Sequence, residues 1–205
     1  MKDKLIIIGA GGHGKVIANI AKLNGYQDIA FLDDDESKVI NGTYKIIGKI
    51  SNLQEYFEGY DVIIGIGNNG IRSMLSNRLS KMGVIQPILI HPSAVIDETV
   101  SIGEGTVVMA NAVINSDSIV GKFCIINTGS TIDHDCVISD LVHISPGAHV
   151  AGSVNVGTMV WLGIGSSVVN NVSIQEKSVI GAGSVVIKDV KTSGTYVGVP
   201  VRRIR

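Results

Sequence analysis

The sequence is poor in the features that mark several classes of protein. Its 17 basic and 18 acidic residues nearly cancel, so the chain lacks the charged surface that nucleic acid or an anionic membrane selects. Its two cysteines, Cys124 and Cys136, provide neither a disulfide framework nor a CxxC metal pair and suit a reducing compartment. No apolar run approaches the roughly 20 residues of a membrane span, and the run at residues 5–8 is too short for a signal-peptide core. We therefore expect a soluble, cytoplasmic protein.

Aromatic residues are also scarce, at 4% of the chain, whereas glycine occurs 25 times. Together with abundant valine and isoleucine, this composition is unusual for a helical enzyme and typical of stacked short strands. The 205 residues are enough for two small domains with proper cores. Two sequence rhythms indicate such a division: an α/β domain over residues 1–90 and an all-β domain over residues 91–205, with Pro87 and Pro92 in the connecting segment.

Residues 1–90 alternate between predicted strands and predicted helices. We expect strands at residues 5–8, 29–32 and 62–66, and helices after the first and third of them. Asn24-Gly25 and Gly83 are the expected helix stops. Strands that alternate with helices imply a parallel sheet, whose ligand sites fall at the carboxyl ends of the strands. The expected apolar helix faces are Val16, Ile17, Ile20 and Ala21 in the first helix and Ile71, Met74, Leu75, Leu79 and Met82 in the second.

From residue 96 the sequence has a period of six. An aliphatic residue stands at every sixth position without exception: Ile96, Ile102, Val108, Ile114, Val120, Ile126, Ile132, Ile138, Ile144, Val150, Val156, Leu162, Val168, Ile174, Ile180 and Val186. The residue two positions earlier is small or β-branched in each case. This pattern predicts a parallel β-helix in which six residues form one face and 18 form one coil, about five coils in all. We expect the aliphatic residues at the corners, each stacked on its equivalents in the next coils.

Five segments carry a resemblance to a known family. They are IIIGAGGHGKV at residues 6–16, FLDDD at 31–35, IGIGNN at 64–69, NTGSTIDHDC at 127–136 and YVGVPVRRIR at 196–205. In combination they resemble the nucleotide-sugar N-acetyltransferases of the PglD type, and the related sialic acid O-acetyltransferases of the NeuD type share much of the pattern. The resemblance implies a left-handed β-helix and a homotrimer that binds acetyl-CoA in the groove between neighbouring coils, with active sites between subunits.

The most informative polar segment is Asp133-His134-Asp135. Acetyl transfer to an amine requires a base, a donor for the oxyanion and a thiolate leaving group, and CoA supplies the last. The resemblance implies that His134 is the general base and that Asp135 stands where the relatives often carry a glutamate. An adjacent carboxylate raises the proton affinity of a histidine and fixes its tautomer, but the sequence leaves open whether the shorter aspartate reaches the ring. The alternative for His134 is an exposed turn histidine.

His143 follows His134 by nine residues, which is half a coil, so a site shared by the two would lie between subunits. The resemblance places His143 at the acetyl-CoA thioester and backbone groups of Ile164 and Ala182 along the CoA arm. A surface histidine is the alternative for His143, and Trp161 either borders the CoA groove or simply packs. The two cysteines occupy the inward position that small residues fill elsewhere, which favours direct attack in a ternary complex over an acyl-enzyme.

The glycine loop of the first domain is a second candidate site. A loop at a helix N-terminus offers backbone N–H groups to a diphosphate, and Asp33 lies about 20 residues further on, where dinucleotide folds place an acid that binds ribose. That pattern alone would suggest NAD, but the spacing is GAGGHG rather than GxGxxG. The alternative is a degenerate Rossmann-like domain that only braces the molecule. The resemblance implies that the nucleotide of a UDP-sugar binds here, contacted by Gly11, Gly12, His13, Asp33, Asp34 and Gly67.

We therefore expect an acetyl-CoA-dependent N-acetyltransferase that acts on the 4-amino group of a UDP-4-amino-4,6-dideoxy-sugar. O-acetylation of a sialic acid or related sugar is the neighbouring alternative. A trimeric β-helix carbonic anhydrase would instead recruit His134, His143 and His149 for a metal, whereas we expect no metal and assign His149 no role. A non-catalytic solenoid that presents a flat face to a partner is the last alternative.

Overall fold

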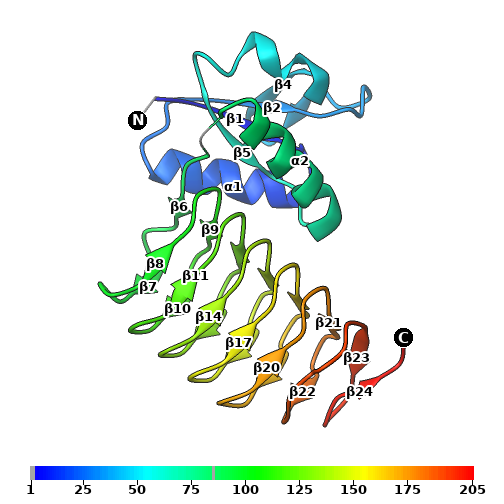
Figure 1. Cartoon of the computed structure of the whole chain (residues 1–205). Helices are drawn as coiled ribbons and strands as arrows, with labels where there is room; N and C mark the ends of the chain where they lie inside the picture. The colour runs from blue at the N-terminus through cyan, green and yellow to red at the C-terminus, as the bar shows by residue number, and fades with distance from the viewer. Residues whose placement is uncertain (1–2, 85) are drawn as a thin grey trace. The chain divides into compact units, whose positions relative to one another are not determined.

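The chain divides after Pro92 into two compact units. The structure is a computed structural model that describes residues 3–84 and 86–205. The first unit is an α/β domain and the second a stack of flat coils, which occupy the blue-to-green and green-to-red parts of the chain in Figure 1. No helix among the described residues is long and apolar enough to cross a membrane.

The first unit contains a five-stranded sheet with the order β3-β4-β2-β1-β5. Strand β1 pairs in parallel with β2 on one side and with β5 on the other, whereas β3 and β4 form an antiparallel hairpin at one edge. The elements are β1 (Lys4–Ile8), α1 (Gly12–Leu23), β2 (Asp28–Leu32), β3 (Ile40–Asn41), β4 (Tyr44–Gly48), the 3₁₀ helix η1 (Ile50–Glu55), β5 (Asp61–Ile64), α2 (Asn69–Lys81) and β6 (Leu89–Ile90).

The sheet differs from the sequence prediction in two ways. The hairpin of β3 and β4 was not expected, and the strand predicted at residues 62–66 ends at Ile64. The helix faces are also narrower than predicted, because Val16, Ile71 and Met74 are 43%, 44% and 64% exposed. The core that the sheet shares with α2 is formed by Ile6, Ile8, Ala30, Leu32, Leu53, Val62, Ile64, Leu75 and Leu79.

The second unit contains sixteen two-residue strands, one for each predicted hexad. They are β7 (Val95–Ile96), β8 (Ser101–Ile102), β9 (Val107–Val108), β10 (Val113–Ile114), β11 (Ile119–Val120), β12 (Ile125–Ile126), β13 (Thr131–Ile132), β14 (Val137–Ile138), β15 (His143–Ile144), β16 (His149–Val150), β17 (Asn155–Val156), β18 (Trp161–Leu162), β19 (Ser167–Val168), β20 (Ser173–Ile174), β21 (Val179–Ile180) and β22 (Val185–Val186). The predicted parallel β-helix is therefore confirmed.

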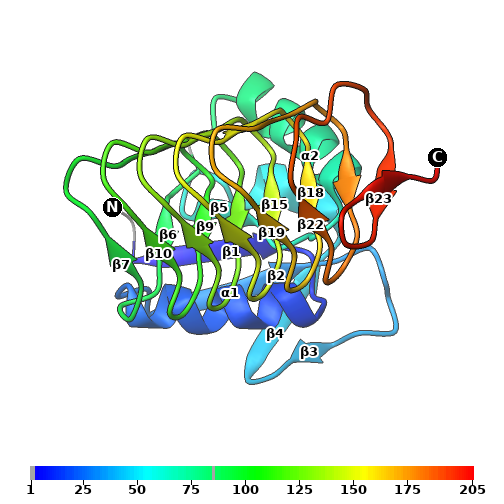
Figure 2. The same cartoon turned by 90° about the horizontal axis from the view of Figure 1, so that it is seen from below.

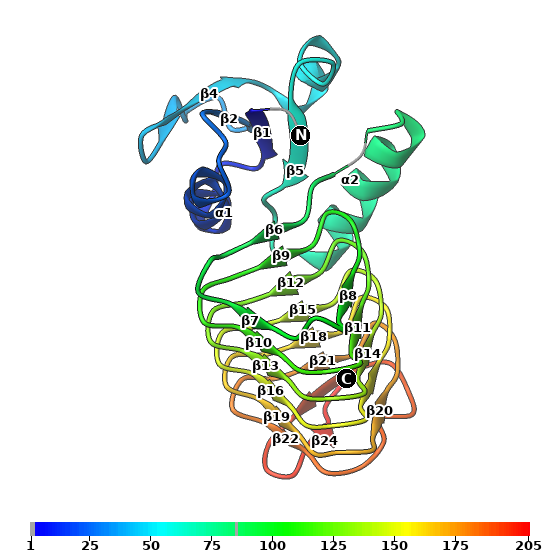
Figure 3. The ribbon, with the colours of Figure 1, turned by 90° about the vertical axis from the view of Figure 1, so that its left-hand side faces the viewer.

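Every third strand belongs to the same flat face, so the coils form a three-sided prism (Figures 2 and 3). The first face contains β7, β10, β13, β16, β19 and β22, and the second contains β8, β11, β14, β17 and β20. The third face contains β9, β12, β15, β18 and β21 and is continued by β23 (Thr195–Val197) and β24 (Arg202–Arg203). Paired residues are 18 apart, as in Ile114 and Ile132.

The corners of the prism fall elsewhere than predicted. The aliphatic residue of each hexad is the second residue of a strand, and the residue two positions earlier also points inward, as the 0% exposure of Ala112, Ser130 and Cys136 shows. The chain bends instead at a residue with left-handed backbone, with φ between 56° and 70°. A single left-handed residue reverses the local twist and gives a sharp turn. These corner residues recur every six positions, at Gly105, Asn111, Asp117, Phe123, Gly129, Asp135, Leu141, Gly147, Ser153, Met159, Gly165, Asn171, Lys177 and Gly183.

Candidate active site

His134 and Asp135 form the corner between the first and second faces. Asp135 is the left-handed residue of this corner, with φ of 57°, a conformation that aspartate tolerates better than most residues. Its backbone N–H donates to the carbonyl of Ser116 at 3.0 Å, in the preceding coil. The corner is thus fixed by the same 18-residue ladder that builds the prism.

The aspartate reaches the imidazole. Nδ1 of His134 lies 2.7 Å from Oδ2 of Asp135, which answers the question that the sequence left open. The hydrogen bond to Asp135 is the main cause that raises the pKa of His134 above its usual value; burial opposes it, and the charges of Asp133 and Asp135 add to the increase. Because a carboxylate accepts from Nδ1–H, Nε2 is the nitrogen with the lone pair. The His134 side chain is 56% exposed, so Nε2 is accessible to a substrate.

Three polar groups hold this corner, and sequence reasoning missed two of the residues that supply them. One oxygen of Asp133 accepts both the backbone N–H of His134 and the side-chain amide of Asn115, each at 2.9 Å. The hydroxyl of Ser118, inside the prism, donates to the carbonyl of Asp133 at 2.7 Å. Asn115 stands 18 residues before Asp133, so the coil period contained a signal for this contact.

His143 lies on the third face and is only 9% exposed. Its ring stacks in parallel on that of Trp161 in the next coil, with 5.6 Å between centroids and 3° between planes. The side-chain nitrogen of Asn127 is 3.3 Å from its Nε2. The indole N–H of Trp161 donates to the hydroxyl of Ser145 at 2.8 Å. The His143 ring is therefore held in place on the outside of this face.

Ile164 and Ala182 lie one coil apart on the corner between the third and first faces. The carbonyl of Ile164 accepts from Gly183 at 2.8 Å. No other described residue accepts a hydrogen bond from the backbone N–H of Ile164 or Ala182. The side chain of Ile164 is 62% exposed. This corner thus offers two successive backbone donors beside an apolar side chain.

His134 and His143 do not meet within one chain. In a triangular prism the corner between the first and second faces lies opposite the third face, and the packed interior separates them. That interior includes the buried Cys136 and Val142. A site that combines His134 with His143, Ile164 and Ala182 requires two chains.

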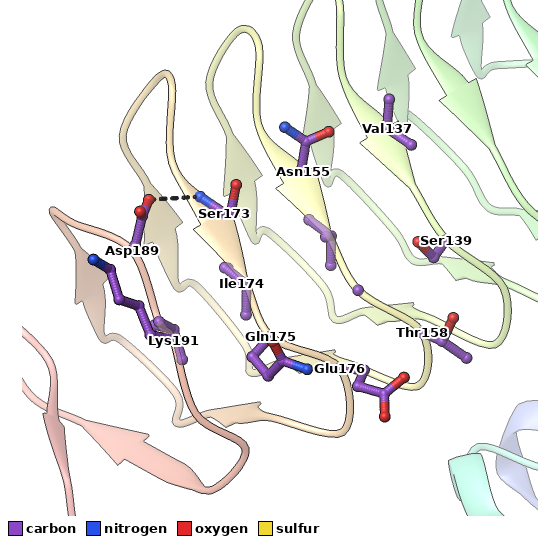
Figure 4. Close-up of a pocket in the computed structure, with 13 residues that line it drawn as sticks. Val137, Ser139, Asn155, Thr158, Ser173, Ile174, Gln175, Glu176, Asp189 and Lys191 are labelled. Carbon is purple, nitrogen blue, oxygen red and sulfur yellow. Dashed lines mark hydrogen bonds between the residues drawn. The ribbon is translucent and has the colours of Figure 1, made fainter.

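The prism also carries two shallow hollows. One, of about 520 Å³, lies on the second face and is lined mainly by polar residues, including Asn155, Ser173, Glu176 and Lys191 (Figure 4). In it Asp189 accepts from the backbone N–H of Ser173 at 3.0 Å. The other, of about 610 Å³, lies on the first face and includes Asn115, Asp133 and His149. His134 and His143 line neither hollow.

In the first unit the structure brings the glycine loop and Asp33 together. The backbone N–H of Ala10 donates to Oδ2 of Asp33 at 2.6 Å, and that of Asp35 donates to Oδ1 at 2.9 Å. Burial alone would raise the pKa of Asp33, but these two N–H groups and Lys38 outweigh it and lower the pKa. The carboxylate therefore stays ionised beside the N-terminus of α1. Gly11 is the N-cap of that helix, and Gly12 is exposed next to it.

His13 and Gly67 gather around a residue that the sequence reading missed. Arg72 is 2% exposed and donates to the carbonyl of Gly67 at 2.9 Å and to the side chain of Asn69 at 2.8 Å. Burial, followed by the charge of Arg72, lowers the pKa of His13 to about 4, so this histidine is neutral at pH 7. An arginine within a helix reads as exposed, which is why no sequence signal pointed to it.

Asp34 is directed to the start of η1 instead, where its carboxylate accepts from the backbone N–H of Ile50 at 3.0 Å. A hollow of about 330 Å³ next to Asp33 is lined by Lys38, Ile46 and Lys49, among others. It contains none of Gly11, Gly12, His13 and Gly67. Of the six residues predicted to bind the nucleotide, Gly11, Gly12 and Asp33 therefore lie in one group and His13 and Gly67 in another. Asp34 instead has a structural contact with η1.

The cysteines and the remaining histidine have structural contacts. The thiols of Cys124 and Cys136 lie inside the prism and donate to the carbonyls of Ser139 and Ala151, each at 3.2 Å. His149 lies on the first face, with Nδ1 3.0 Å from the hydroxyl of Thr131. His134, His143 and His149 therefore occupy a corner and two different faces. Across residues 3–84 and 86–205, three or more potential metal-ligating side chains do not cluster.

A left-handed parallel β-helix with an exposed His–Asp pair on one corner, preceded by an α/β domain, is the architecture of a hexapeptide-repeat acyltransferase. A family model described as the PglD N-terminal domain matches residues 4–79. The acetyltransferase domain of PglB from Neisseria gonorrhoeae FA1090 is 37% identical, with a TM-score of 0.95, and the match covers 99% of this chain and 100% of that one. This chain therefore belongs to the family of PglD- and PglB-type acetyltransferases.

Two further relatives carry names that mention a sugar. PerB from Caulobacter crescentus, solved in complex with CoA and GDP-perosamine, is 36% identical with a TM-score of 0.93, and the match covers 98% of this chain and 96% of that one. A UDP-N-acetylbacillosamine N-acetyltransferase from Bacillus subtilis is 38% identical over 113 residues. That alignment covers 51% of this chain and 50% of the Bacillus enzyme, so this similarity spans only half of the curated relative.

Proposed function

We propose that this chain transfers the acetyl group of acetyl-CoA to the amino group of a nucleotide-linked amino sugar, with a UDP-4-amino-4,6-dideoxy-sugar as the expected acceptor. The observation that carries the proposal is the 2.7 Å contact between His134 and Asp135 on an exposed corner. Such a pair presents a basic nitrogen in a fixed direction. Named relatives acetylate or bind amino sugars linked to UDP and to GDP, which supports a nucleotide-sugar acceptor.

The chemistry requires the protein to take up one proton from the amine and to return it to the CoA sulfur. Nε2 of His134 removes a proton from the attacking amine as the amine nitrogen bonds to the thioester carbon, and Asp135 stabilises the imidazolium that forms. The C–S bond then breaks, the leaving thiolate takes this proton from the imidazolium, and an N-acetyl sugar and CoA thiol leave. A hydrogen bond from the ring of His143 to the acetyl carbonyl would stabilise the negative charge on that oxygen. The buried cysteines are too enclosed to act as nucleophiles, which supports direct transfer.

A homotrimer completes this site. Because His134 lies on the corner opposite the third face, the base of one chain meets His143 and the backbone donors at Ile164 and Ala182 only across a subunit boundary. We infer that three prisms assemble with one such boundary between each pair. Two cysteines that form no disulfide fit the cytoplasm as the place of the reaction.

The first unit supplies the nucleotide site in this proposal. Gly11 and Gly12 lie at the N-terminus of α1, where a diphosphate is favoured, and Asp33 accepts hydrogen bonds near that loop. His13, Gly67 and Asp34 complete the proposed contact set. His13 is neutral at pH 7, and the buried, charged Arg72 acts on it, so the positive charge at this end of the site comes from Arg72 and the negative charge at the other end from Asp33.

The test is a thiol-release assay with acetyl-CoA and a panel of UDP- and GDP-linked amino sugars. His134→Ala should lower kcat by about 10²- to 10⁴-fold, the usual contribution of a positioned base, with an unchanged thermal unfolding temperature because the side chain is exposed. His149→Ala serves as a matched histidine control and should retain activity. Full activity of His134→Ala would refute the mechanism, and release of thiol only with CMP-linked or free hydroxylated sugars would favour O-acetylation.

A further inference from the structure

The ring of His134 lies against the backbone of Gly152, one coil further along the chain. A side-chain carbon built on Gly152 would fall 2.6 Å from both Cε1 and Nε2 of His134 and 3.2 Å from Cδ2. Carbon atoms do not approach other heavy atoms that closely without a shift of one of them. The imidazole therefore occupies the space that any other residue at position 152 would fill.

The backbone itself does not require glycine at this position. Gly152 is absent from the residues with left-handed φ, and the corner residue of its own turn is Ser153. Other β-helix glycines of this kind are needed for a different reason, since a side chain at Gly103 or Gly157 would overlap the backbone of the next coil. At Gly152 the three nearest atoms all belong to the imidazole of His134.

We propose that Gly152 is a positioning residue for the general base, an inference that rests on the proposed function. The absence of a side chain lets the Cε1–Nε2 edge of the imidazole lie against the next coil while Nδ1 reaches Asp135, so that the ring keeps one orientation. The coil above is itself fixed to the corner, because the backbone N–H of Ser153 donates to the carbonyl of His134 at 2.9 Å. Ring and glycine cannot separate unless the side chain rotates.

A methyl group at position 152 should turn the ring outward. The backbone of the corner is fixed by Asp133 and by the coil ladder, so rotation of the His134 side chain is the easiest response. Rotation lengthens the contact between Nδ1 and Asp135, and the pKa of His134 then falls toward its usual value because that hydrogen bond is the main cause of its increase. Asp133 and Asp135 are the charged groups that act on this ring, and the charge of Asp133 remains.

The experiment compares Gly152→Ala with the wild-type protein and with Gly129→Ala. A methyl group at Gly129 meets no atom within 4 Å, although its φ of 64° makes the substitution strained. Gly129→Ala should therefore lose some stability and keep its activity. Gly152→Ala should lower kcat by about 10- to 100-fold, the scale expected when a reacting group is misplaced by about 1 Å, while KM for acetyl-CoA stays within about twofold.

A second measurement does not depend on turnover. The pKa of His134, followed by NMR of its ring protons, should fall in Gly152→Ala and in Asp135→Asn, and the double variant should fall no further because both act through one hydrogen bond. An unchanged pKa together with an unchanged kcat in Gly152→Ala would overturn the proposal. If the unchanged protein has no acetyltransferase activity, the proposed function fails, and the NMR titration still decides whether Gly152 positions the ring.

Discussion

The two units of this chain place their residues by different rules. In the β-helix the strands in the middle of each face pair with strands 18 residues before and after them, as β13 does with β10 and β16. In the α/β unit the central strand β1 pairs with β2 and also with β5, which begins more than fifty residues later. A change in the prism therefore affects neighbours that the coil period identifies, whereas a change at β1 affects segments that are distant in sequence.

Glycine substitutions should show the largest difference between the units. A side chain at Gly121 would come within 2.8 Å of the backbone of Ser139 and Asp140 in the next coil, and one at Gly14 would overlap the carbonyl of Gly9 in the glycine loop. We expect each alanine variant to cost about 2–3 kcal/mol of unfolding free energy in its own unit. Trp161 is the single tryptophan, so its fluorescence follows the prism alone.

Two spectroscopic probes of the same thermal unfolding experiment distinguish the two units. Gly121→Ala should lower the unfolding temperature reported by Trp161 fluorescence. Gly14→Ala should leave that temperature unchanged and lower the unfolding temperature of the first unit, which far-ultraviolet circular dichroism detects. Gly129→Ala, at an open corner with a left-handed backbone, should lower the stability of the prism by about 1–2 kcal/mol and leave the first unit unchanged. If both substitutions shift both probes equally, the two units unfold as one and the comparison fails.

A smaller effect is expected from Asp33→Asn. The loss of a carboxylate that accepts two backbone N–H groups should weaken nucleotide binding by about tenfold, since a hydrogen bond to a charged group contributes about 1.5–3 kcal/mol, while the pKa of His134 stays unchanged. The folded state lowers the pKa of Asp33. Its contribution to stability is therefore complete above the unfolded pKa, about 3.9, and is lost as the pH falls through the folded value.

Binding of UDP to the variant by calorimetry, and acid unfolding with and without the substitution, provide the measurements. In Asp33→Asn the first unit should lose less stability as the pH falls, because this carboxylate is no longer there to be protonated. The prism, followed by Trp161, serves as the internal control. Unaltered UDP binding would show that the loop and Asp33 do not form the nucleotide site.

The smallest effect should come from the stacked pair on the third face. Trp161→Leu removes a parallel ring contact with His143, and aromatic pairs contribute about 0.5–1.5 kcal/mol. Because the His143 ring would be less firmly held at the acetyl carbonyl, kcat should fall by about 2- to 10-fold while KM for acetyl-CoA stays nearly unchanged. Trp161→Phe keeps an aromatic ring but loses the hydrogen bond to Ser145, so its effect should lie between the wild-type protein and Trp161→Leu. A large loss of kcat in Trp161→Leu would instead indicate that the indole acts in the chemical step.

The same contrast explains what could be predicted from the sequence. In the prism one period of six identified all sixteen strands and their inward residues, because each residue meets its equivalent in the next coil. The corners were misplaced, since the left-handed position is held by residues as different as Gly129, Phe123 and Lys177 and so leaves no compositional signal. In the first unit the hairpin of β3 and β4 was missed because its pairing depends on the fold of the sheet.

In the candidate site, too, contacts between neighbours in sequence could be predicted and contacts between distant residues could not. The pairing of His134 with Asp135 is local, and the residues themselves pointed to it. Asn115 and Ser118 contact the neighbouring Asp133, and Gly152 lies against the His134 ring; all three belong to neighbouring coils, so the residues 133–135 alone do not reveal them. Arg72 was missed because its side chain is buried through hydrogen bonds to the carbonyl of Gly67 and to Asn69, and a charged residue in a helix normally faces solvent.

The 18-residue repeat has a consequence for any change in chain length. Removing one hexad between His143 and Ile164 would rotate everything downstream by a third of a revolution, and the amide donors at Ile164 and Ala182 would then emerge on a different edge from the one that borders the His143 ring. Insertions, deletions and chimeric junctions in this half are therefore expected to preserve acetyl transfer only when they add or remove whole revolutions. Length differences among functional relatives should accordingly be multiples of one coil there, and free in size only at loops that project outward.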